Sequence, residues 1–305
     1  MSLPLAPPSA MRSTAPGDRL RRAVDAALGI SGAVARQGLA PAERLWLEAV
    51  SRPELSAATR RAADLPIPPG LRRTLYGAYA RLYGVDLADA ADPLEAYPSF
   101  NAFFTRALRP GARPITAEDG ALACPADARL DRMGPLDASG LLPQVKGERY
   151  TVAELLGDEA HASRFTAGRF SVLYLSPRDY HRVHCPADAT LRALRPVAGR
   201  LYPVNALATR HLPRLFAINE RLVFDLDSER FGPIALVMVA ATNVGRITTG
   251  LAPGDRVAKG AELGVFNLGS TVVLLSSDPR LVPADLVEGA ATRVGQAISR
   301  LGARG

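Results

Sequence analysis

From about Ala112 to the C-terminus, the sequence is a succession of short apolar runs separated by Gly, Pro, Asp and Asn. Each run has the length of a β-strand, and the residues between the runs are those that turns prefer. None of the runs approaches the roughly 20 apolar residues that a membrane-spanning helix needs. The pattern therefore predicts a mainly antiparallel β domain, with strands at residues 170–175, 191–197, 221–226, 234–240 and 271–275.

Two segments of this β region are near copies of each other. Cys124–Leu130 reads CPADARL and Cys185–Leu191 reads CPADATL, which suggests an internally duplicated sandwich or barrel-like unit. Residues 252–266 also resemble the hairpins of the barrel-sandwich hybrid folds of lipoyl and biotinyl carriers, with glycines at two turn positions between strand formers. The expected fold class is α+β, with N-terminal amphipathic helices followed by a barrel-sandwich-hybrid-like β domain.

The N-terminal third has a different pattern. Residues 1–16, rich in Pro, Ser and Ala, are expected to form a disordered leader. Residues 17–97 are expected to be helical, with one helix from about residue 18, one opened by Pro41 and one after Pro69. Arginines outnumber acidic residues here, although the whole chain has a net charge of only +7. The third helix separates apolar from basic residues, which suits either an anionic membrane surface or packing on the protein's own β domain.

Few side chains in this sequence are suited to acid–base or metal chemistry. Cys124 and Cys185 lie too far apart for a CxxC pair or a zinc quartet, so both are expected to be free thiols in a reducing compartment. Two of the four histidines, His181 and His184, are three residues apart. No third ligand follows at a suitable spacing, so no metal is expected; either histidine could be structural or could act as an acid or base near neutral pH.

A second candidate site is Gly269-Ser270, directly before an apolar strand. A structural turn is the common meaning of such a sequence. However, a glycine carbonyl has little steric cover, so an activated Ser270 hydroxyl could attack it and convert the peptide bond into an ester. Removal of the Ser270 α-proton would then eliminate the Gly269 carboxylate, and the resulting dehydroalanine would hydrolyse to a pyruvoyl group.

Taken together and in order, these motifs resemble bacterial, pyruvoyl-dependent phosphatidylserine decarboxylases. The resemblance covers roughly residues 98 to 300, and its most specific strings are YLSPRDYHRVH, ending at His184, and LGST, containing Ser270. The other matching segments are 100–110, Pro125–Asp127, Lys146-Gly147 with Tyr150, 215–221 and 241–245.

The resemblance implies roles for individual residues. Asp127, His184 and Ser270 match the family's self-processing triad, and Gly269-Ser270 matches its cleavage site. His181 matches a further family histidine, expected to protonate the substrate after carbon dioxide leaves. Asp188, which occupies the position of Asp127 in the second copy, matches no catalytic residue. The cofactor would be a covalent pyruvoyl group derived from Ser270, with no metal and no pyridoxal phosphate.

The resemblance also implies the reaction and the partners. Cleavage would give a β chain (1–269) and an α chain (270–305), so that residues 98–305 form a catalytic domain of two fragments, a heterodimer that could dimerise further. The pyruvoyl ketone would form a Schiff base with phosphatidylserine and yield phosphatidylethanolamine and CO2, a carboxy-lyase reaction. The enzyme would bind peripherally to the anionic cytoplasmic face of the cell membrane and would bind no nucleic acid.

Two other functions fit parts of the sequence. An unprocessed serine hydrolase could use Asp127, His184 and Ser270 as a stable triad, although the GxSxG elbow of many such enzymes is missing. A lipoyl- or biotinyl-like carrier would need a modifiable lysine at a hairpin tip, for which Lys259 is a poor match because no methionine flanks it.

Overall fold

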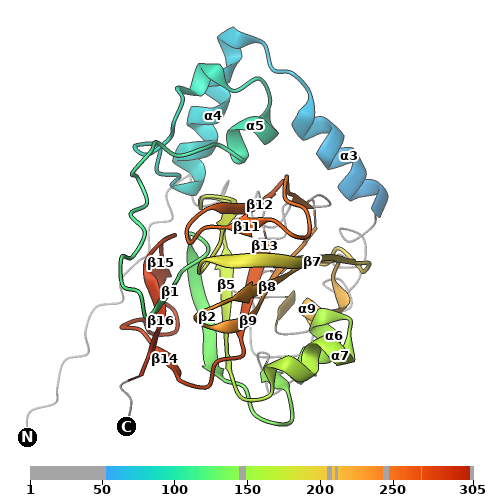
Figure 1. The fold of residues 1–305 in the computed structure, drawn as a ribbon. Helices are drawn as coiled ribbons and strands as arrows, with labels where there is room; N and C mark the ends of the chain where they lie inside the picture. The colour runs from blue at the N-terminus through green and yellow to red at the C-terminus, as the bar shows by residue number, and fades with distance from the viewer. Residues whose placement is uncertain are drawn as a thin grey trace, which may run out of the picture.

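The computed structural model describes residues 53–143, 149–204, 208–209, 212–242, 247–268 and 270–302, without the side chains of Pro53 and Ser270. The expected leader and the two helices expected before residue 52 lie outside the described residues. In the described part, the helices of residues 53–104 gather at one end of the molecule, and the strands form the body below them, with further short helices at its lower side (Figure 1). This arrangement confirms an α+β chain whose sheets are mainly antiparallel.

The helical part contains α3, α4, a short 3₁₀ helix and α5. Helix α4 begins at Pro69, where a missing N–H costs nothing, and ends before Gly84, whose φ of 70° suits a left-handed cap. The helix predicted after Pro69 is thus confirmed. Helix α3 lies in the segment 17–97 that was expected to be helical, but no separate helix was predicted at residues 53–64, because this alanine-rich sequence has too few large apolar residues to show a period. The bounds are α3 Pro53–Asp64, α4 Pro69–Tyr83, η1 Leu94–Ala96 and α5 Phe100–Phe104.

Aromatic side chains join these helices and attach them to the β domain. Tyr76 of α4 stacks on Phe103 of α5, with ring centroids 4.7 Å apart, and both side chains are fully buried. Residues 100–104 therefore pack with the helical part. The hydroxyl of Tyr79 donates to the carbonyl of Pro177 (3.1 Å), and Asn101 donates to the side chain of Asn267 (3.1 Å). Both contacts reach loops of the β domain that border the candidate site.

An eight-stranded antiparallel sheet forms the body of the β domain, in the order β11-β7-β8-β9-β13-β5-β2-β15. Its long central strands include all five predicted from apolar runs, each within two residues of the predicted ends. The bounds are β2 Ala128–Pro135, β5 Arg169–Leu175, β7 Ala189–Val197, β8 Arg221–Ser228, β9 Gly232–Val239, β11 Arg256–Val257, β13 Ser270–Ser276 and β15 Ala291–Thr292.

Three small sheets and several short helices complete the β domain. β1 (Ala121–Ala123), β16 (Ala297–Leu301) and β14 (Leu281–Pro283) form one sheet, β10 (Ile247–Thr248), β12 (Glu262–Phe266) and β6 (Arg182–His184) another, and β3 (Leu141–Pro143) pairs with β4 (Arg149–Thr151). The helices are α6 Val152–Leu156, α7 Glu159–Ala162, η3 Ser163–Phe165 and α9 Leu215–Ile218.

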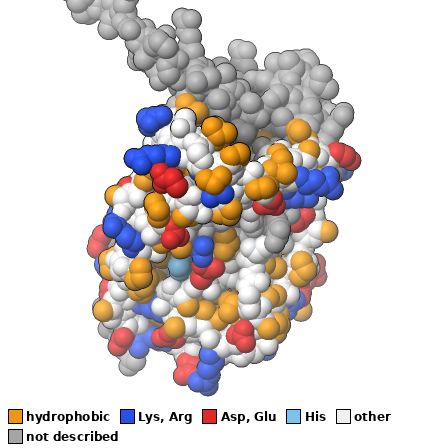
Figure 2. Space-filling view, turned by 90° about the horizontal axis from the view of Figure 1, so that it is seen from above, with side chains coloured by type: hydrophobic (Ala, Val, Ile, Leu, Met, Phe, Trp, Pro, Cys, Tyr) orange, Lys and Arg blue, Asp and Glu red, His pale blue; other side chains and the backbone are white. Residues whose placement is uncertain are grey.

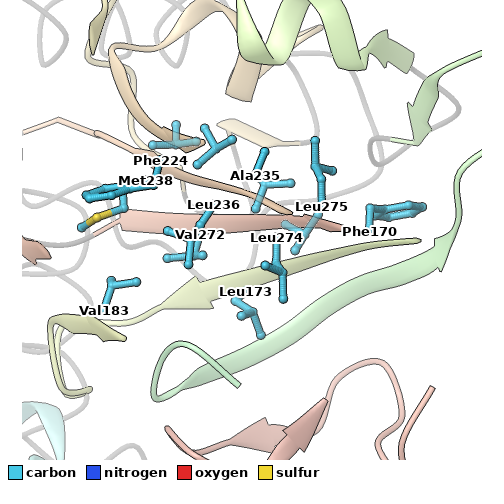
Figure 3. Packing of buried hydrophobic residues seen from close by; sticks show 14 of the residues in the cluster. Phe170, Leu173, Val183, Phe224, Ala235, Leu236, Met238, Val272, Leu274 and Leu275 are labelled. Atoms are coloured by element: carbon cyan, nitrogen blue, oxygen red, sulfur yellow. The ribbon is translucent and has the colours of Figure 1, made fainter. Parts of the chain in front are cut away.

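The hydrophobic core lies on both faces of the central strands (Figure 3). Strand β13 is paired on one side with β5 and on the other with β9, and its residues 272–275 are almost completely buried. Burial on both faces explains why this strand reads as a continuous apolar run. The burial of each such side chain contributes roughly 1.5–3 kcal/mol to the stability of the folded state. The strand that begins at Ser270 is therefore fixed at the centre of the fold.

The two near copies in the sequence occupy equivalent positions. The N–H of Ala123 donates to the carbonyl of Pro186, and the N–H of His184 donates to the carbonyl of Pro125, both at 2.8 Å. The strand after each copy pairs with a short strand in the same register: β2 with β15, and β7 with β11. These reciprocal bonds support the internal duplication that the sequence suggested.

Candidate active site

Asp127 lies in the turn before β2 and has a dense set of hydrogen bonds. The guanidinium of Arg113 donates to both carboxylate oxygens: Nε to Oδ1 (3.0 Å) and Oδ2 (2.9 Å), and Nη2 to Oδ2 (2.6 Å). The N–H of Val294 donates to Oδ1 at 2.8 Å. Arg113 also contacts Asp89 at 2.8 Å. The side chain of Asp127 is 11% exposed, so these donors replace most of its contact with water.

His184 is the last residue of β6, and both of its ring nitrogens have partners. Its Nδ1 lies 2.8 Å from the carbonyl of Gly260, which can only accept, so the proton is on Nδ1. Nε2 then accepts from the hydroxyl of Tyr180 at 3.2 Å, and the two rings stack with centroids 5.6 Å apart. Burial raises the pKa of Tyr180 to about 12, so the phenol keeps its proton. His184 therefore presents its basic nitrogen toward Tyr180.

Asp127 and His184 are neighbours, but neither ring nitrogen of His184 is bonded to the carboxylate. The main-chain bond from His184 to Pro125 places the histidine beside the turn that carries Asp127. Burial lowers the pKa of the His184 imidazole, while the Gly260 carbonyl and the charges of Glu262 and Asp127 oppose that shift. Asp127 and His184 are therefore linked by the charge of the carboxylate and by a main-chain hydrogen bond, and not by a bond between their side chains.

His181 is fully buried beside the helical part. Its ring lies 4.0 Å from that of Phe104, centroid to centroid, and its Nδ1 donates to the carbonyl of Asp179 at 2.8 Å. Burial, together with the nearby cation of Arg106, lowers the pKa of His181 to about 3, so it is neutral. Among the described residues, its Nε2 has no hydrogen-bond partner. A buried lone pair of this kind is costly unless a ligand or substrate meets it.

The expected cleavage site lies at the start of β13. The backbone of Ser270 pairs with Leu175 of β5, while Gly269 and the side chain of Ser270 lie outside the description. Leu268 has a φ of 79°, in the left-handed region that a branched side chain rarely adopts. Strain of this type is typical of functional sites. After the expected cleavage site, the hydroxyl of buried Thr271 has no hydrogen-bond partner among the described residues.

Two strand pairings, β6 with β12 and β5 with β13, connect the segment that contains the histidines to this cleavage site. Strands β6 and β12 are paired, with Val265 opposite Arg182, and the N–H of Phe266 donates to the carbonyl of His181 at 3.0 Å. The chain therefore passes His181 just before it reaches residue 270, and β5 supplies the partner of Ser270 before leading into the loop to β6. His181 and the start of β13 thus lie at the same end of the β6–β12 pairing, while His184 is paired with Glu262 at its other end.

Sequence reasoning missed Arg113, Tyr180 and Arg106. Arg113 meets a carboxylate 14 residues away through a contact between two loops, which no local pattern predicts. Tyr180 and Arg106 both lie inside strings that were recognised, but nothing in those strings indicates which atoms face the histidines. Lys146, Gly147, His211 and Gly245 lie outside the described residues. In the part of the chain that the structure describes, no group of three His, Cys, Asp or Glu side chains could hold a metal.

Comparison with known proteins decides the family. The sequence profile described as phosphatidylserine decarboxylase matches residues 100–300. The chain belongs to the phosphatidylserine decarboxylase family. The phosphatidylserine decarboxylase proenzyme of Xanthomonas euvesicatoria is 44% identical over 266 residues, which cover 81% of this chain and 94% of that protein. The phosphatidylserine decarboxylase proenzyme of Bordetella petrii is 44% identical over 236 residues, which cover 70% of this chain and 81% of that protein.

Membership in the phosphatidylserine decarboxylase family confirms the resemblance found in the motifs and the expected enzyme class, a carboxy-lyase. The matched region contains the histidine pair, both near copies and the start of β13. It begins at α5, so helices α3 and α4 lie outside the matched profile. The two other functions considered, a stable serine hydrolase and a lipoyl-like carrier, lose their support.

Proposed function

We propose that this chain cleaves itself between Gly269 and Ser270 and then converts phosphatidylserine to phosphatidylethanolamine and CO2. The observation that carries the proposal is that His181, whose carbonyl accepts from Phe266, and the strained backbone of Leu268 lie just before the start of β13, within the region matched to the family. His184 follows three residues after His181, on β6. The relatives are named proenzymes, which agrees with a chain that must be processed.

In self-cleavage we assign the base to His184 and the nucleophile to Ser270. His184 suits the role because its lowered pKa keeps Nε2 unprotonated at neutral pH. The Ser270 oxygen bonds to the Gly269 carbonyl carbon as the C–N bond breaks, and the proton passes through His184 to the amine. Loss of the α-proton then expels the Gly269 carboxylate, and water replaces the nitrogen, which leaves as ammonia. Asp127 stabilises the protonated histidine.

The residues around the start of β13 fit a pyruvoyl group. Thr271 and His181 each offer a buried polar atom without a partner in the described structure, next to where the group would form. When present, the group supplies an electron-withdrawing carbonyl for the amine of the substrate. We assign protonation of the substrate carbon to His181. Its Nε2 must first take up a proton, which an anionic substrate beside it would favour.

Intact-mass measurement tests the cleavage. Purified wild-type protein should give two fragments that meet between residues 269 and 270, with the smaller lighter by the change from serine to pyruvoyl. Ser270→Ala should give one uncleaved chain with no turnover of phosphatidylserine. Ser276→Ala is the matched control, because this buried serine ends the same strand; it should cleave like wild type. A single intact chain from the active wild type would refute the proposal.

We also propose that the helical end docks on an anionic membrane surface. No described helix is long and apolar enough to span a membrane. Leucines of α3, α4 and the link between them are exposed, and Figure 2 shows hydrophobic and basic side chains side by side on this end. The leucines are Leu55, Leu65, Leu71 and Leu75. Apolar contacts and nearby arginines both favour an anionic bilayer, by up to about 1 kcal/mol per basic residue.

Vesicle co-sedimentation tests this docking surface. Leu71→Ser with Leu75→Ser should reduce binding to vesicles that contain phosphatidylserine. Val287→Ser, a change at an exposed residue of the β domain, should leave binding unchanged. High salt should release the wild-type protein, as expected for peripheral attachment. Unchanged binding of the double variant would exclude these leucines as the docking surface. The cytoplasmic face of the cell membrane remains the predicted location.

The finer architecture is also a proposal. We propose that the β domain is a barrel-sandwich hybrid, with the catalytic domain from about residue 98 to 305 after a helical segment from residue 17. The reciprocal bonds between the two copies support the first part. After cleavage, residues 1–269 and 270–305 would form the heterodimer, which could dimerise further.

A further inference from the structure

The duplication places a second aspartate in the same structural position as Asp127. In the first copy, Oδ1 of Asp127 accepts from the N–H of Val294; in the second, Oδ1 of Asp188 accepts from the N–H of Lys259, both at 2.8 Å. Each accepted N–H precedes a glycine with positive φ, 88° and 84° respectively. This bond fixes a turn in both copies, so it does not explain why one aspartate is suited to chemistry.

What differs between the two aspartates is Arg113. The guanidinium of Arg113 donates to both carboxylate oxygens of Asp127. The side chain of Arg113 is 13% exposed and that of Asp127 is 11% exposed. Asp188 is exposed, and within the described part of the chain it forms no ion pair. A planar guanidinium that donates two bonds fixes the plane of a carboxylate as well as its charge, which one main-chain N–H cannot do.

Arg113 is itself held independently of Asp127. Its Nη1 donates to Asp89 (2.8 Å), in the loop after α4, and to the carbonyl of Ala112 (2.8 Å). Although burial opposes it, hydrogen bonds to Asp127 and Asp89 raise the pKa of Arg113 above its usual range. The guanidinium is therefore a fixed, permanently charged support that is positioned partly by the helical end of the molecule.

We propose that Arg113 is a positioning residue for self-cleavage: it holds the carboxylate of Asp127, charged and in one orientation, beside His184. The inference rests on the proposed role of Asp127. Arg113 touches no reacting atom and acts through the aspartate. It also neutralises the charge of Asp127, which with that of Glu262 raises the pKa of His184, while the charge of Arg182 lowers it.

The experiment follows self-cleavage of the full chain by pulse-labelled cell-free synthesis and a timed chase. Asp127→Asn should slow cleavage strongly, and Arg113→Gln should slow it at least about tenfold, since misplacement of a catalytic group is costly. Arg113→Lys keeps the positive charge but cannot donate to both carboxylate oxygens as the planar guanidinium does. It should therefore cleave faster than Arg113→Gln and more slowly than wild type. Asp188→Asn, the matched control, should stay within about twofold of wild type, because it changes only the equivalent turn bond.

Two further measurements separate positioning from a merely structural role. If Arg113 acts through Asp127, the double variant Arg113→Gln, Asp127→Asn should cleave no more slowly than Asp127→Asn alone. The pH midpoint of cleavage should also rise in Arg113→Gln, because the unbalanced charge of Asp127 raises the pKa of His184. The midpoint in Arg113→Lys should stay near that of wild type.

The outcomes distinguish the inference from the proposed function. Normal cleavage of Asp127→Asn would remove the role proposed for Asp127. Slow cleavage of Asp127→Asn with wild-type rates for Arg113→Gln, or for Arg113→Lys if the glutamine variant does not fold, would overturn the inference alone. Equal slowing by Arg113→Gln with and without Asp127 would show a structural role and would also overturn it.

Discussion

At the scale of single residues, the site is defined by how its polar groups are paired. His184 has partners at both ring nitrogens, whereas His181 and Thr271 each keep an unpartnered atom within the described structure. Two histidines three residues apart thus have different environments. In a strand they would point to opposite faces, and here His184 ends β6 while His181 precedes it.

Self-cleavage should depend on pH through His184. Burial lowers its pKa, so the neutral, basic form persists to lower pH than in a free histidine, and the rate should fall only below about pH 6.5. Glu262→Gln removes a charge that raises this pKa, so it should move the midpoint to still lower pH. Cleavage rates of the pulse-labelled chain across a pH series measure both. A midpoint well above 6.5, or an upward shift in Glu262→Gln, would contradict the assignment of His184.

At the scale of elements, strand prediction succeeded for five long strands of the large sheet that contain apolar runs. Runs such as 271–275 are apolar throughout because both faces of the sheet are covered, and turn residues mark their ends. Two- and three-residue strands such as β10 and β14 carry no readable period, so they were not predicted. The pairing of Arg113 with Asp127 depends on how distant loops meet, which a single sequence does not encode locally.

Thr271 should be a destabilising residue in its own strand. Its buried hydroxyl lacks a partner among the described residues, so Thr271→Val should stabilise the uncleaved Ser270→Ala chain by about 1 kcal/mol, measured by urea unfolding. In the cleavable chain, the same change should reduce phosphatidylserine turnover.

Thr292 supplies the matched comparison for this prediction. It is equally buried, but its hydroxyl donates toward the carbonyls of Ala126 (3.4 Å) and Ala128 (3.2 Å). Thr292→Val should therefore destabilise the chain, by about 1 kcal/mol, because it removes a buried hydrogen bond. If Thr271→Val destabilised the chain as Thr292→Val does, the hydroxyl of Thr271 would have a partner.

At the scale of the whole molecule, the strands that follow the cleavage site pair with strands that precede it in three places of the β domain. β13 pairs with β5 and β9, β15 with β2, and β16 with β1. The bond between Asp127 and Val294 adds a further tie. Cleavage removes one covalent bond but none of these pairings.

The two fragments should therefore remain together after cleavage. Size-exclusion chromatography in buffer should give one peak that contains both, and concentrated urea should separate them. The cleaved protein should unfold with one transition, because β13 lies in the middle of the common core. Separate elution of the fragments in buffer would contradict this expectation.

The backbone on the two sides of the cut is restrained unequally. Ser270 is paired with Leu175 of β5 and Thr271 with both β5 and β9, whereas Leu268 is held in a torsion that costs energy as long as the chain is continuous. We expect the break to release that torsion, so that the new carboxyl tail can withdraw while the new end of β13 stays in place. The same step that creates the reactive carbonyl would then also open the approach by which a lipid headgroup reaches it.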